Sequence, residues 1–435
     1  MRTFIKGKYL IYDLELKKDW GLIIEDNKID KVGPIDVLVN GYYDIEMDRT
    51  SQIIAPGFIN GHTHMYGVLS HGISVDAVVT EFSSFLEDFW WPHVEDRLDH
   101  NLLRTTTKWA CVEMIDSGIT TFMDVLEGPN TLPNALQVEA EEVEKSGLRS
   151  ILSFEACTRV SEENGNLGLT ENVEFIKSRG SNDLIQGMVS IHTLFTADKE
   201  FVKKAKRLSD ECGSSLHMHL SESIFEPNYT LNKYGKRPVE IYEDWNILDK
   251  NTFASQVVKV DENEIIKIAK SKMRTVSMPL SNCEVGGGIA PVEELMKLGV
   301  EVGLGTDGYI NNFFEVMRGA FLIHKANQQN PQAMPSRLVY DMATRMGAKA
   351  MGLNEVGELK EGYCADIITI DMDTPTPINE HNIFDQLVLF RNPSNVRDVL
   401  VNGRILKEDG KIKTLDVDVI KGQMRSATEA FWKVE

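Results

Sequence analysis

Short apolar runs alternate with longer helical patterns through the middle of the chain, from about residue 57 to residue 350. The runs have the length and composition of strands, and the segments between them carry apolar residues at helical spacing and a glycine near the end. Eight strands are expected, at residues 57–64, 118–125, 148–156, 187–195, 214–222, 252–260, 273–281 and 299–307. This alternation predicts an α/β fold, a (β/α)₈ TIM barrel, although a doubly wound sheet produces the same pattern.

The two ends of the chain have a different pattern, with short strands separated by glycine, asparagine and aspartate turns. Residues 1–56 contain three such stretches, and residues 354–435 contain two more, followed by a helical segment. Neither end is long enough to bury a core of its own. We therefore expect one small composite β-sandwich built from both termini, beside a barrel formed by residues 57–353.

Composition and charge narrow the classes of partner. The 435 residues carry a formal net charge of −20, which argues against nucleic acid and anionic membranes because both bind basic surfaces. No uninterrupted apolar run of about 18 residues predicts a transmembrane helix, and the N-terminus lacks the apolar core of a signal peptide. The five scattered cysteines form no CxxC pair, which predicts a cytoplasmic protein with free thiols.

Two histidines, His62 and His64, lie one residue apart at the end of the first expected barrel strand. Alternate residues of a strand face the same way, and catalytic groups of a barrel lie at the C-terminal ends of its strands. The two imidazoles can therefore share one metal ion, although a pair of surface or capping histidines has the same spacing. The fifth expected strand repeats this spacing at His217 and His219, and the second cluster favours a metal site.

Two carboxylates follow expected strands in the same way. Glu222 comes three residues after His219, where strand becomes loop, and this position suits a proton shuttle. Asp307 ends the last expected strand, where a lone aspartate would more often form a turn. With Asp307, the histidines at 62, 64 and 219 complete a set of three nitrogens and one oxygen that suits Zn²⁺ or Fe²⁺ and leaves room for water. A divalent ion there lowers the pKa of that water toward neutrality.

Six motifs together resemble the amidohydrolase superfamily along nearly the whole chain and in the same order. They are PGFINGHTH, HMHLSES, NKYGKRPVE, PLSNCEVGGGIAPVEELMKLGVEVGLGTDG, GELKEGYCADIITID and VLVNGRIL. The resemblance is greatest to the branch of heterocycle deaminases and triazine hydrolases, and within it to an aminohydrolase associated with selenium metabolism. The motifs are specific for the superfamily and much less specific for a substrate.

The resemblance implies the (β/α)₈ barrel, the composite β-sandwich and one divalent metal ion, with Zn²⁺ first and Fe²⁺ or Mn²⁺ as alternatives. It assigns metal binding or proton transfer to five residues: the ligands His62, His64, His219 and Asp307, of which Asp307 also moves protons, and the proton shuttle Glu222. It places His192 where relatives have a histidine that contacts substrate. His217 has no role in the family, and we interpret it as a neighbour or an alternative ligand. The fourth expected strand has no lysine, which argues for one metal ion rather than two.

The chain departs from the family pattern at two adjacent strand ends. Most relatives have a histidine in the sixth strand, within AHCVH, whereas this chain reads FASQVVKVD and has Gln256 as the nearest polar group. The seventh strand usually reads HNPxSN, and here Ser277 and Met278 replace the histidine and the asparagine. Glutamine donates or accepts a hydrogen bond but is no acid or base near pH 7. We expect the metal ligands to be kept and the groups around the transition state to differ, with Gln256 as a candidate substrate contact.

Two further stretches have more than one interpretation. The aromatic cluster at residues 89–93, FWWPH, most often represents packing between helices. If it instead covers a flat ring, Trp90 or Trp91 is the candidate wall. The glycine run at residues 286–288 is not followed by the GK[ST] of a phosphate-binding loop, so we interpret it as a plain loop after the seventh strand.

Three functions are consistent with these observations. The first, which we favour, is hydrolytic deamination of a small purine-, pterin- or pyrimidine-like substrate by metal-activated hydroxide. The second is hydrolysis of a cyclic amide or of a carbon–halogen bond, as in triazine hydrolases, with the same nucleophile. The third is a metal-binding relative of low activity, which the missing histidine supports and the kept Glu222 and Asp307 argue against. A homo-oligomer is a common state for a soluble enzyme of this kind.

Overall fold

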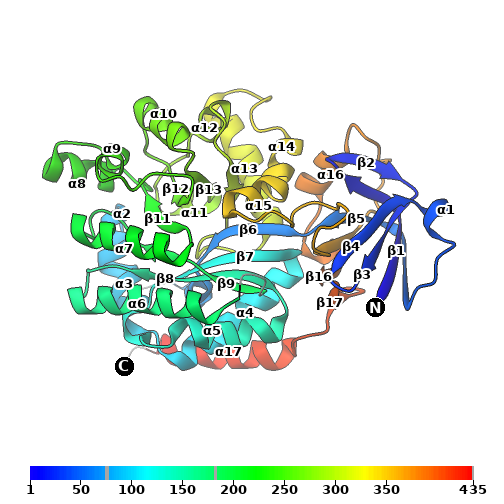
Figure 1. Ribbon diagram of the computed structural model, residues 1–435, viewed down its shortest axis with the longest axis horizontal. Helices are drawn as coiled ribbons and strands as arrows, with labels where there is room; N and C mark the ends of the chain where they lie inside the picture. The colour runs from blue at the N-terminus through cyan, green and yellow to red at the C-terminus, as the bar shows by residue number, and fades with distance from the viewer. Residues whose placement is uncertain (74–77, 181–183, 434–435) are drawn as a thin grey trace.

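A closed barrel of eight parallel strands forms the centre of the molecule (Figure 1). The computed structural model describes residues 1–73, 78–180 and 184–433. The barrel strands, in chain order, are β6 (Phe58–Thr63), β7 (Ile119–Leu126), β8 (Arg149–Ala156), β10 (Val189–Ile191), β11 (Leu216–Leu220), β12 (Thr252–Gln256), β13 (Arg274–Ser277) and β14 (Val302–Leu304). Parallel pairing of β14 with β6 closes the barrel, and a short strand, β9 (Ile185–Gly187), also pairs with β8.

The closed barrel confirms the predicted fold and excludes the doubly wound sheet. Each of the eight expected strands overlaps an observed one. The fourth and the eighth differ most from their predictions, because β10 and β14 each have three residues where nine were expected. In the fourth run, β10 ends at Ile191 and the backbone then turns, with the amide of Thr196 donating to the carbonyl of Thr193. This turn places the polar residues of that run in a loop at the C-terminal end of the barrel.

Helices surround the barrel on its outside (Figure 1). The longer ones are α4 (His100–Ser117), α5 (Ala135–Ser146), α6 (Glu162–Ser178), α7 (Lys199–Cys212), α8 (Phe225–Tyr234), α10 (Glu262–Ser271), α13 (Phe313–Gln328), α16 (Ile383–Phe390) and α17 (Val417–Phe431). The shorter ones are α2 (Phe82–Ser84), α3 (Trp91–His93), α9 (Pro238–Asp244), α11 (Pro279–Glu284), α12 (Val292–Lys297), α14 (Ser336–Met342) and α15 (Arg345–Met351), with the turns η1 (Met65–Leu69), η2 (Phe85–Trp90) and η3 (Glu95–Arg97). Helix α1 (Ile35–Leu38) lies away from the barrel, against the sheet formed by the N-terminal strands. In the described part of the chain, no helix is long and apolar enough to cross a bilayer.

Local sequence sets where these helices begin and end. The carboxylate of Asp99 accepts a hydrogen bond from the amide of Leu102 and so caps the first turn of α4. Gly118 ends the same helix with a φ of 84°, a conformation that glycine adopts without strain. Asp198 and Gly213 frame α7 in the same way. These two helices therefore end just before the next barrel strand begins.

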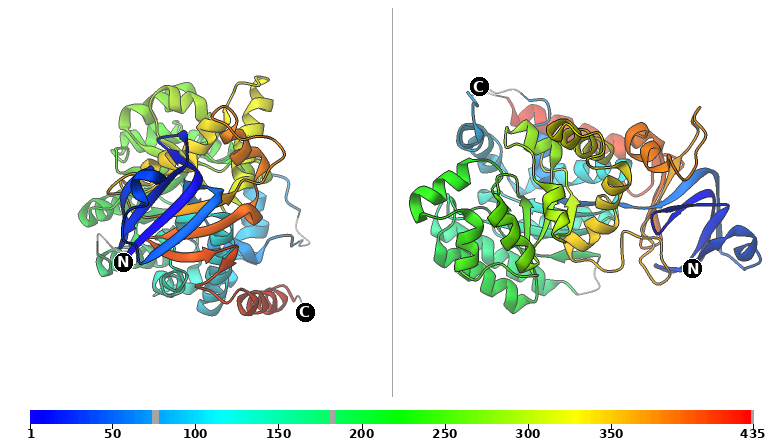
Figure 2. Two further views of the ribbon diagram at one scale, coloured as in Figure 1. Left: turned by 90° about the vertical axis from the view of Figure 1, so that its right-hand side faces the viewer. Right: turned by 90° about the horizontal axis from the view of Figure 1, so that it is seen from above.

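Strands from both ends of the chain form a second sheet beside the barrel (Figures 1 and 2). They are β1 (Arg2–Tyr12), β2 (Glu15–Lys18), β3 (Trp20–Glu25), β4 (Lys28–Pro34), β5 (Ile45–Pro56), β15 (Ile367–Asp371), β16 (Val396–Val401), β17 (Arg404–Glu408) and β18 (Lys411–Ile412). Antiparallel pairing of β5 with β15 joins the two halves, so all nine strands belong to one hydrogen-bonded sheet. The predicted union of the two termini is thus confirmed. After the sheet, α17 returns along α4 on the outside of the barrel.

A buried ion pair links the sheet to the barrel and gives a stability prediction. Arg149 at the start of β8 donates to both carboxylate oxygens of Asp366, at 2.8 and 3.1 Å. Asp366→Ala leaves the guanidinium without this partner and is expected to lower the free energy of unfolding by about 3 kcal/mol. Denaturant unfolding measures the loss. Asp48→Ala breaks an exposed pair with Lys6 and is the control, with an expected loss below about 1 kcal/mol; equal losses would contradict the prediction.

Candidate active site

Three histidines predicted to bind metal meet at the C-terminal ends of the barrel strands. His62 lies in β6, His64 directly follows that strand, and His219 lies in β11. The ring centroid of His62 is 4.8 Å from that of His64 and 4.8 Å from that of His219. One nitrogen of each ring lies within 4.8 Å of the others, and all three side chains are buried. The three rings are therefore close enough to contact a single ion.

Asp307, the fourth predicted ligand, lies beside these rings. Its Oδ1 is 3.3 Å from His64 Nε2 and 4.0 Å from His62 Nε2, and its backbone amide donates to the carbonyl of His62. Burial acts to raise the pKa of Asp307, but the neighbouring imidazoles and a hydrogen bond from Gln256 outweigh it and lower that pKa below its usual value. The side chain is therefore a carboxylate near neutral pH, which is the form that binds metal.

The hydrogen bonding of the rings fits a divalent metal ion. Both ring nitrogens of His62 are buried and have no hydrogen-bond partner among the described residues. Burial, with the nearby histidines, holds the pKa of His62 well below its usual value, so the ring is neutral and keeps a free lone pair. His64 Nδ1 lies 2.5 Å from the carbonyl oxygen of Val125; it must donate there, which leaves Nε2 free toward Asp307. Buried nitrogens without a partner are rare unless an ion or ligand satisfies them.

Gln256, which replaces the expected histidine of the sixth strand, contacts a predicted metal ligand directly. Its Nε2 donates to Asp307 Oδ2 at 2.7 Å, and Ser281 Oγ donates to the same oxygen at 2.9 Å. The amide of Asn282 in turn donates to Gln256 Oε1. The substitution therefore removes an acid–base group but keeps a donor that fixes the orientation of Asp307.

The backbone is strained where several of these strands end. Ser221, Gln256 and Asp307 have φ values of 50°, 76° and 59°, and Val257 has a φ of 49°. The left-handed region is unfavourable for residues other than glycine, most of all for a β-branched residue such as valine. Such strain of about 1–3 kcal/mol per residue concentrates at functional sites, where surrounding contacts hold it in place. The strand ends thus aim side chains in directions that relaxed strands would not.

Glu222, the predicted proton shuttle, follows β11 and lines the same cavity. Burial raises the pKa of its carboxyl well above the usual value, and the negative charges of Asp307 and Glu155 add to the effect, while Asn282 opposes it. A Cβ on Gly287 would come within 2.5 Å of the Glu222 carbonyl oxygen. Gly287 therefore lets the loop that contains the glycine run pass against the backbone of Glu222.

A cavity of about 440 Å³ opens over the histidines. One side is aromatic, formed by Phe82, Phe85, Phe89, Trp90 and Trp91. Trp90 satisfies both interpretations of its cluster, since it is buried against the rings of Tyr66 and Phe85 and also forms part of the cavity wall. His192 lines the cavity as predicted for a substrate contact, with its ring centroid 5.5 Å from that of His219. Its Nδ1 lies 3.0 Å from the hydroxyl oxygen of Thr196.

His217 lies deeper in the barrel than the other rings. It is fully buried, its ring stacks on that of His62 with 5.3 Å between centroids, and its Nδ1 lies 2.8 Å from the hydroxyl oxygen of Ser190. Its Nε2 has no hydrogen-bond partner among the described residues. These contacts are consistent with both interpretations of His217, as a packing neighbour of His62 and as an alternative metal ligand.

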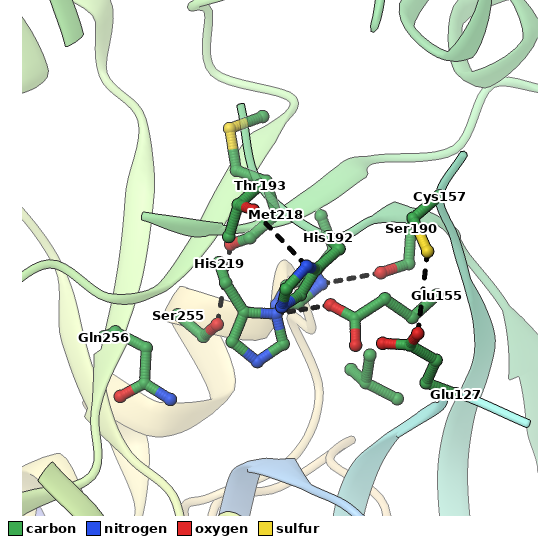
Figure 3. Close-up of polar contacts among 12 residues, drawn as sticks. Glu127, Glu155, Cys157, Ser190, His192, Thr193, Met218, His219, Ser255 and Gln256 are labelled. Atoms are coloured by element: carbon green, nitrogen blue, oxygen red, sulfur yellow. Dashed lines mark hydrogen bonds and ion pairs between the residues drawn. The ribbon is translucent and has the colours of Figure 1, made fainter. Parts of the chain in front are cut away.

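Three glutamates of the cavity wall were missed by the sequence analysis. Glu95 lies in η3, Glu127 directly follows β7, and Glu155 lies near the end of β8. Glu155 Oε1 is 2.5 Å from His219 Nδ1, and Figure 3 shows Glu127 next to it. Two of them were detectable as carboxylates at the ends of the second and third expected strands, in MDVLE and SFEA. No motif with a fixed spacing contains them, so the sequence does not single them out.

Comparisons with known proteins agree with this fold. Residues 53–406 match the amidohydrolase family. A 5-methylthioadenosine/S-adenosylhomocysteine deaminase of Carboxydothermus hydrogenoformans is 35% identical over 92% of this chain and 91% of its own. A 5'-deoxyadenosine deaminase of Methanosphaera stadtmanae is 31% identical over 95% of each chain. The crystal structure of a zinc-containing adenosine deaminase of Xanthomonas campestris superposes with a TM-score of 0.90 at 20% identity, over 99% of both chains.

Proposed function

The chain belongs to the amidohydrolase family, and on this premise we propose that it is a metal-dependent hydrolase that removes an amino group from a nitrogen heterocycle. The observation that carries the proposal is the meeting of three buried histidines and an aspartate at the strand ends, beside a cavity that also contains a glutamate. Relatives more than 30% identical are named as deaminases of adenosine derivatives. Adenosine derivatives are therefore the first substrates to test, followed by pterins and pyrimidines.

We assign the metal site to four residues: His62, His64, His219 and Asp307. Zn²⁺ is the first candidate because three imidazole nitrogens and one carboxylate oxygen form a set that zinc accepts. Fe²⁺ and Mn²⁺ bind the same types of ligand, so elemental analysis of the purified protein decides between them. When bound, the ion would supply an activated water molecule near neutral pH.

We assign proton transfer to Glu222 and the positioning of the ring to the cavity wall. Deamination needs a group that takes up a proton and delivers it to the departing nitrogen, and a carboxyl with a raised pKa can hold that proton near neutral pH. Asp307 is a second acceptor for a proton at the same place. His192 and the face formed by Trp90 can orient a flat heterocycle by hydrogen bonding and stacking.

The test is release of ammonia from a panel of aminopurines, adenosine derivatives, aminopterins and aminopyrimidines by the zinc-loaded protein. Release by the wild type, absent from Glu222→Gln, would support the proposal and name the ring class. Release of a halide from a halogenated triazine, or opening of a cyclic amide, without ammonia would instead support the second kind of hydrolysis. A full complement of metal with no turnover on any panel would contradict the proposal and indicate a metal-binding relative.

Gln256 gives a prediction of its own under this proposal. Gln256→Ala removes one of two side-chain donors to Asp307 Oδ2 and is expected to lower kcat/KM by about 10- to 100-fold, as loss of groups that orient metal ligands does. Metal content should change little because all four assigned ligands remain. Ser277→Ala, at the neighbouring strand end, is the control. Unchanged kinetics for Gln256→Ala would mean that its hydrogen bond to Asp307 only stabilises the fold.

A further inference from the structure

Three buried glutamates form one wall of the cavity, which we call the carboxylate wall and define as Glu95, Glu127 and Glu155. Each is at most 3% exposed, and all three line the cavity. They come from three different segments, so the fold gathers them rather than the local sequence. Glutamate is almost never fully buried without a partner that neutralises it. The proton transfer assigned to Glu222 does not explain why three further carboxyls are buried at this cavity.

A single arginine supports this wall from behind. Arg159 contacts Glu127 through Nε, and its Nη2 lies 3.1 Å from Glu95 and 2.9 Å from Asp96. Its guanidinium lies 5.0 Å from the ring of Trp91 and is not part of the cavity lining. One positive charge thus faces several carboxyls on the side away from the cavity. A cluster that served only stability would pair each carboxyl with a positive charge, whereas here one arginine faces three carboxyls.

Glu155 is the least satisfied member of the wall. Its Oε1 is 2.5 Å from His219 Nδ1, but the contact lacks hydrogen-bond geometry, and no described residue donates a hydrogen bond to Oε1. The cost of these buried carboxyls falls if a donor or a cation enters the cavity beside them.

The rest of the described cavity lining adds further carboxyls and no cationic lysine or arginine. Besides the wall it contains Glu222, Glu284 and Asp307. Neither lysine nor arginine occurs among the described residues that line it. An anionic substrate group would therefore enter a low-dielectric space where, among the described residues, it meets carboxyls and no lysine or arginine, so its charge would stay unpaired.

We propose that the carboxylate wall recognises a cationic or N–H-rich group on the substrate, of the amidinium or guanidinium type, and excludes substrates that carry a carboxylate or a phosphate. This proposal rests on the proposed function and names its substrate class. A planar amidinium presents two parallel N–H donors that match a carboxylate. Because Glu155 contacts His219, the recognised group belongs to the heterocycle near its reacting carbon, rather than to a distant tail of the substrate.

The test compares two flat probes of equal size and opposite charge, benzamidinium and benzoate. Calorimetry uses the full-length protein after chelation of its metal, so that benzoate gains no affinity as a metal ligand. Benzamidinium is expected to bind at least about 10-fold more tightly than benzoate, because charge pairs across a desolvated surface select strongly between partners. Benzoate that binds as tightly, or benzamidinium that does not bind, would overturn the proposal.

Variants place the binding at the wall. Glu127→Gln keeps the size of the side chain and is expected to weaken benzamidinium binding by about 10-fold or more. Glu95→Gln tests the same wall if the first variant does not fold. Glu144→Gln removes one charge from an exposed position on α5 and should leave binding unchanged. Equal affinity of the wild type and a folded wall variant would overturn the proposal. This binding test does not measure ammonia release, so a failure of the carboxylate-wall proposal can be told apart from a failure of the deaminase proposal.

Discussion

Glu222→Gln is expected to retain its metal ion and to lose most of its turnover, with kcat lower by about 10²- to 10⁴-fold. Glutamine has the size and the hydrogen-bonding atoms of glutamate, but it cannot take up and release a proton near neutral pH. The four residues assigned to the metal are untouched by this change. Because the departing amino group must receive a proton, the loss should fall on the chemical step and not on substrate binding, so that KM changes little.

Elemental analysis and steady-state kinetics on the same preparation measure both parts of this result. Glu144→Gln is the matched control, since it makes the same substitution on the surface and should behave as the wild type. A variant with near-normal kcat would remove Glu222 from proton transfer. A variant that loses its metal together with its activity would make Glu222 part of the metal site instead.

The barrel was predictable from the sequence because its strands are buried on both faces. The sequence of such a strand is a nearly continuous apolar run, as in ITTFMDVL of β7. The helices between the strands begin at capping residues and end at glycines, and both can be recognised in the sequence. The length of the fourth strand was not predictable in this way. The run from Gly187 to Phe195 has strand composition throughout, but tertiary contacts turn the chain after Ile191.

The residues assigned to the metal and the proton were predictable because they lie in motifs with fixed spacing. The neighbours of Asp307 were not: nothing in the sequence says that Gln256 and Ser281 donate to the same carboxylate oxygen, since they come from different segments. The carboxylate wall was missed for the same reason. A lone glutamate in the sequence is most often a solvated side chain, and only the closure of the barrel shows that Glu127 and Glu155 face one cavity.

Asp307→Asn is expected to weaken metal binding and activity together, with metal affinity lower by at least about 10- to 100-fold. The substitution removes the negative charge beside the three histidines assigned to the metal. It also replaces one carboxylate oxygen with an NH₂ group, while Gln256 Nε2 and Ser281 Oγ both donate to Oδ2 and Gly308 donates to Oδ1. Whichever way the new amide turns, at least one of these donors loses its acceptor.

Competition with a chelator measures the affinity, and ammonia release measures the activity. Ser281→Ala is the control, because it removes one hydrogen bond to Asp307 and keeps the carboxylate, so its effect on metal affinity should be small. Added zinc should restore part of the activity of Asp307→Asn, whereas it should restore none to Glu222→Gln, whose defect is in proton transfer. An Asp307→Asn protein with unchanged metal content and full activity would exclude Asp307 from the site and leave its three neighbouring histidines one ligand short.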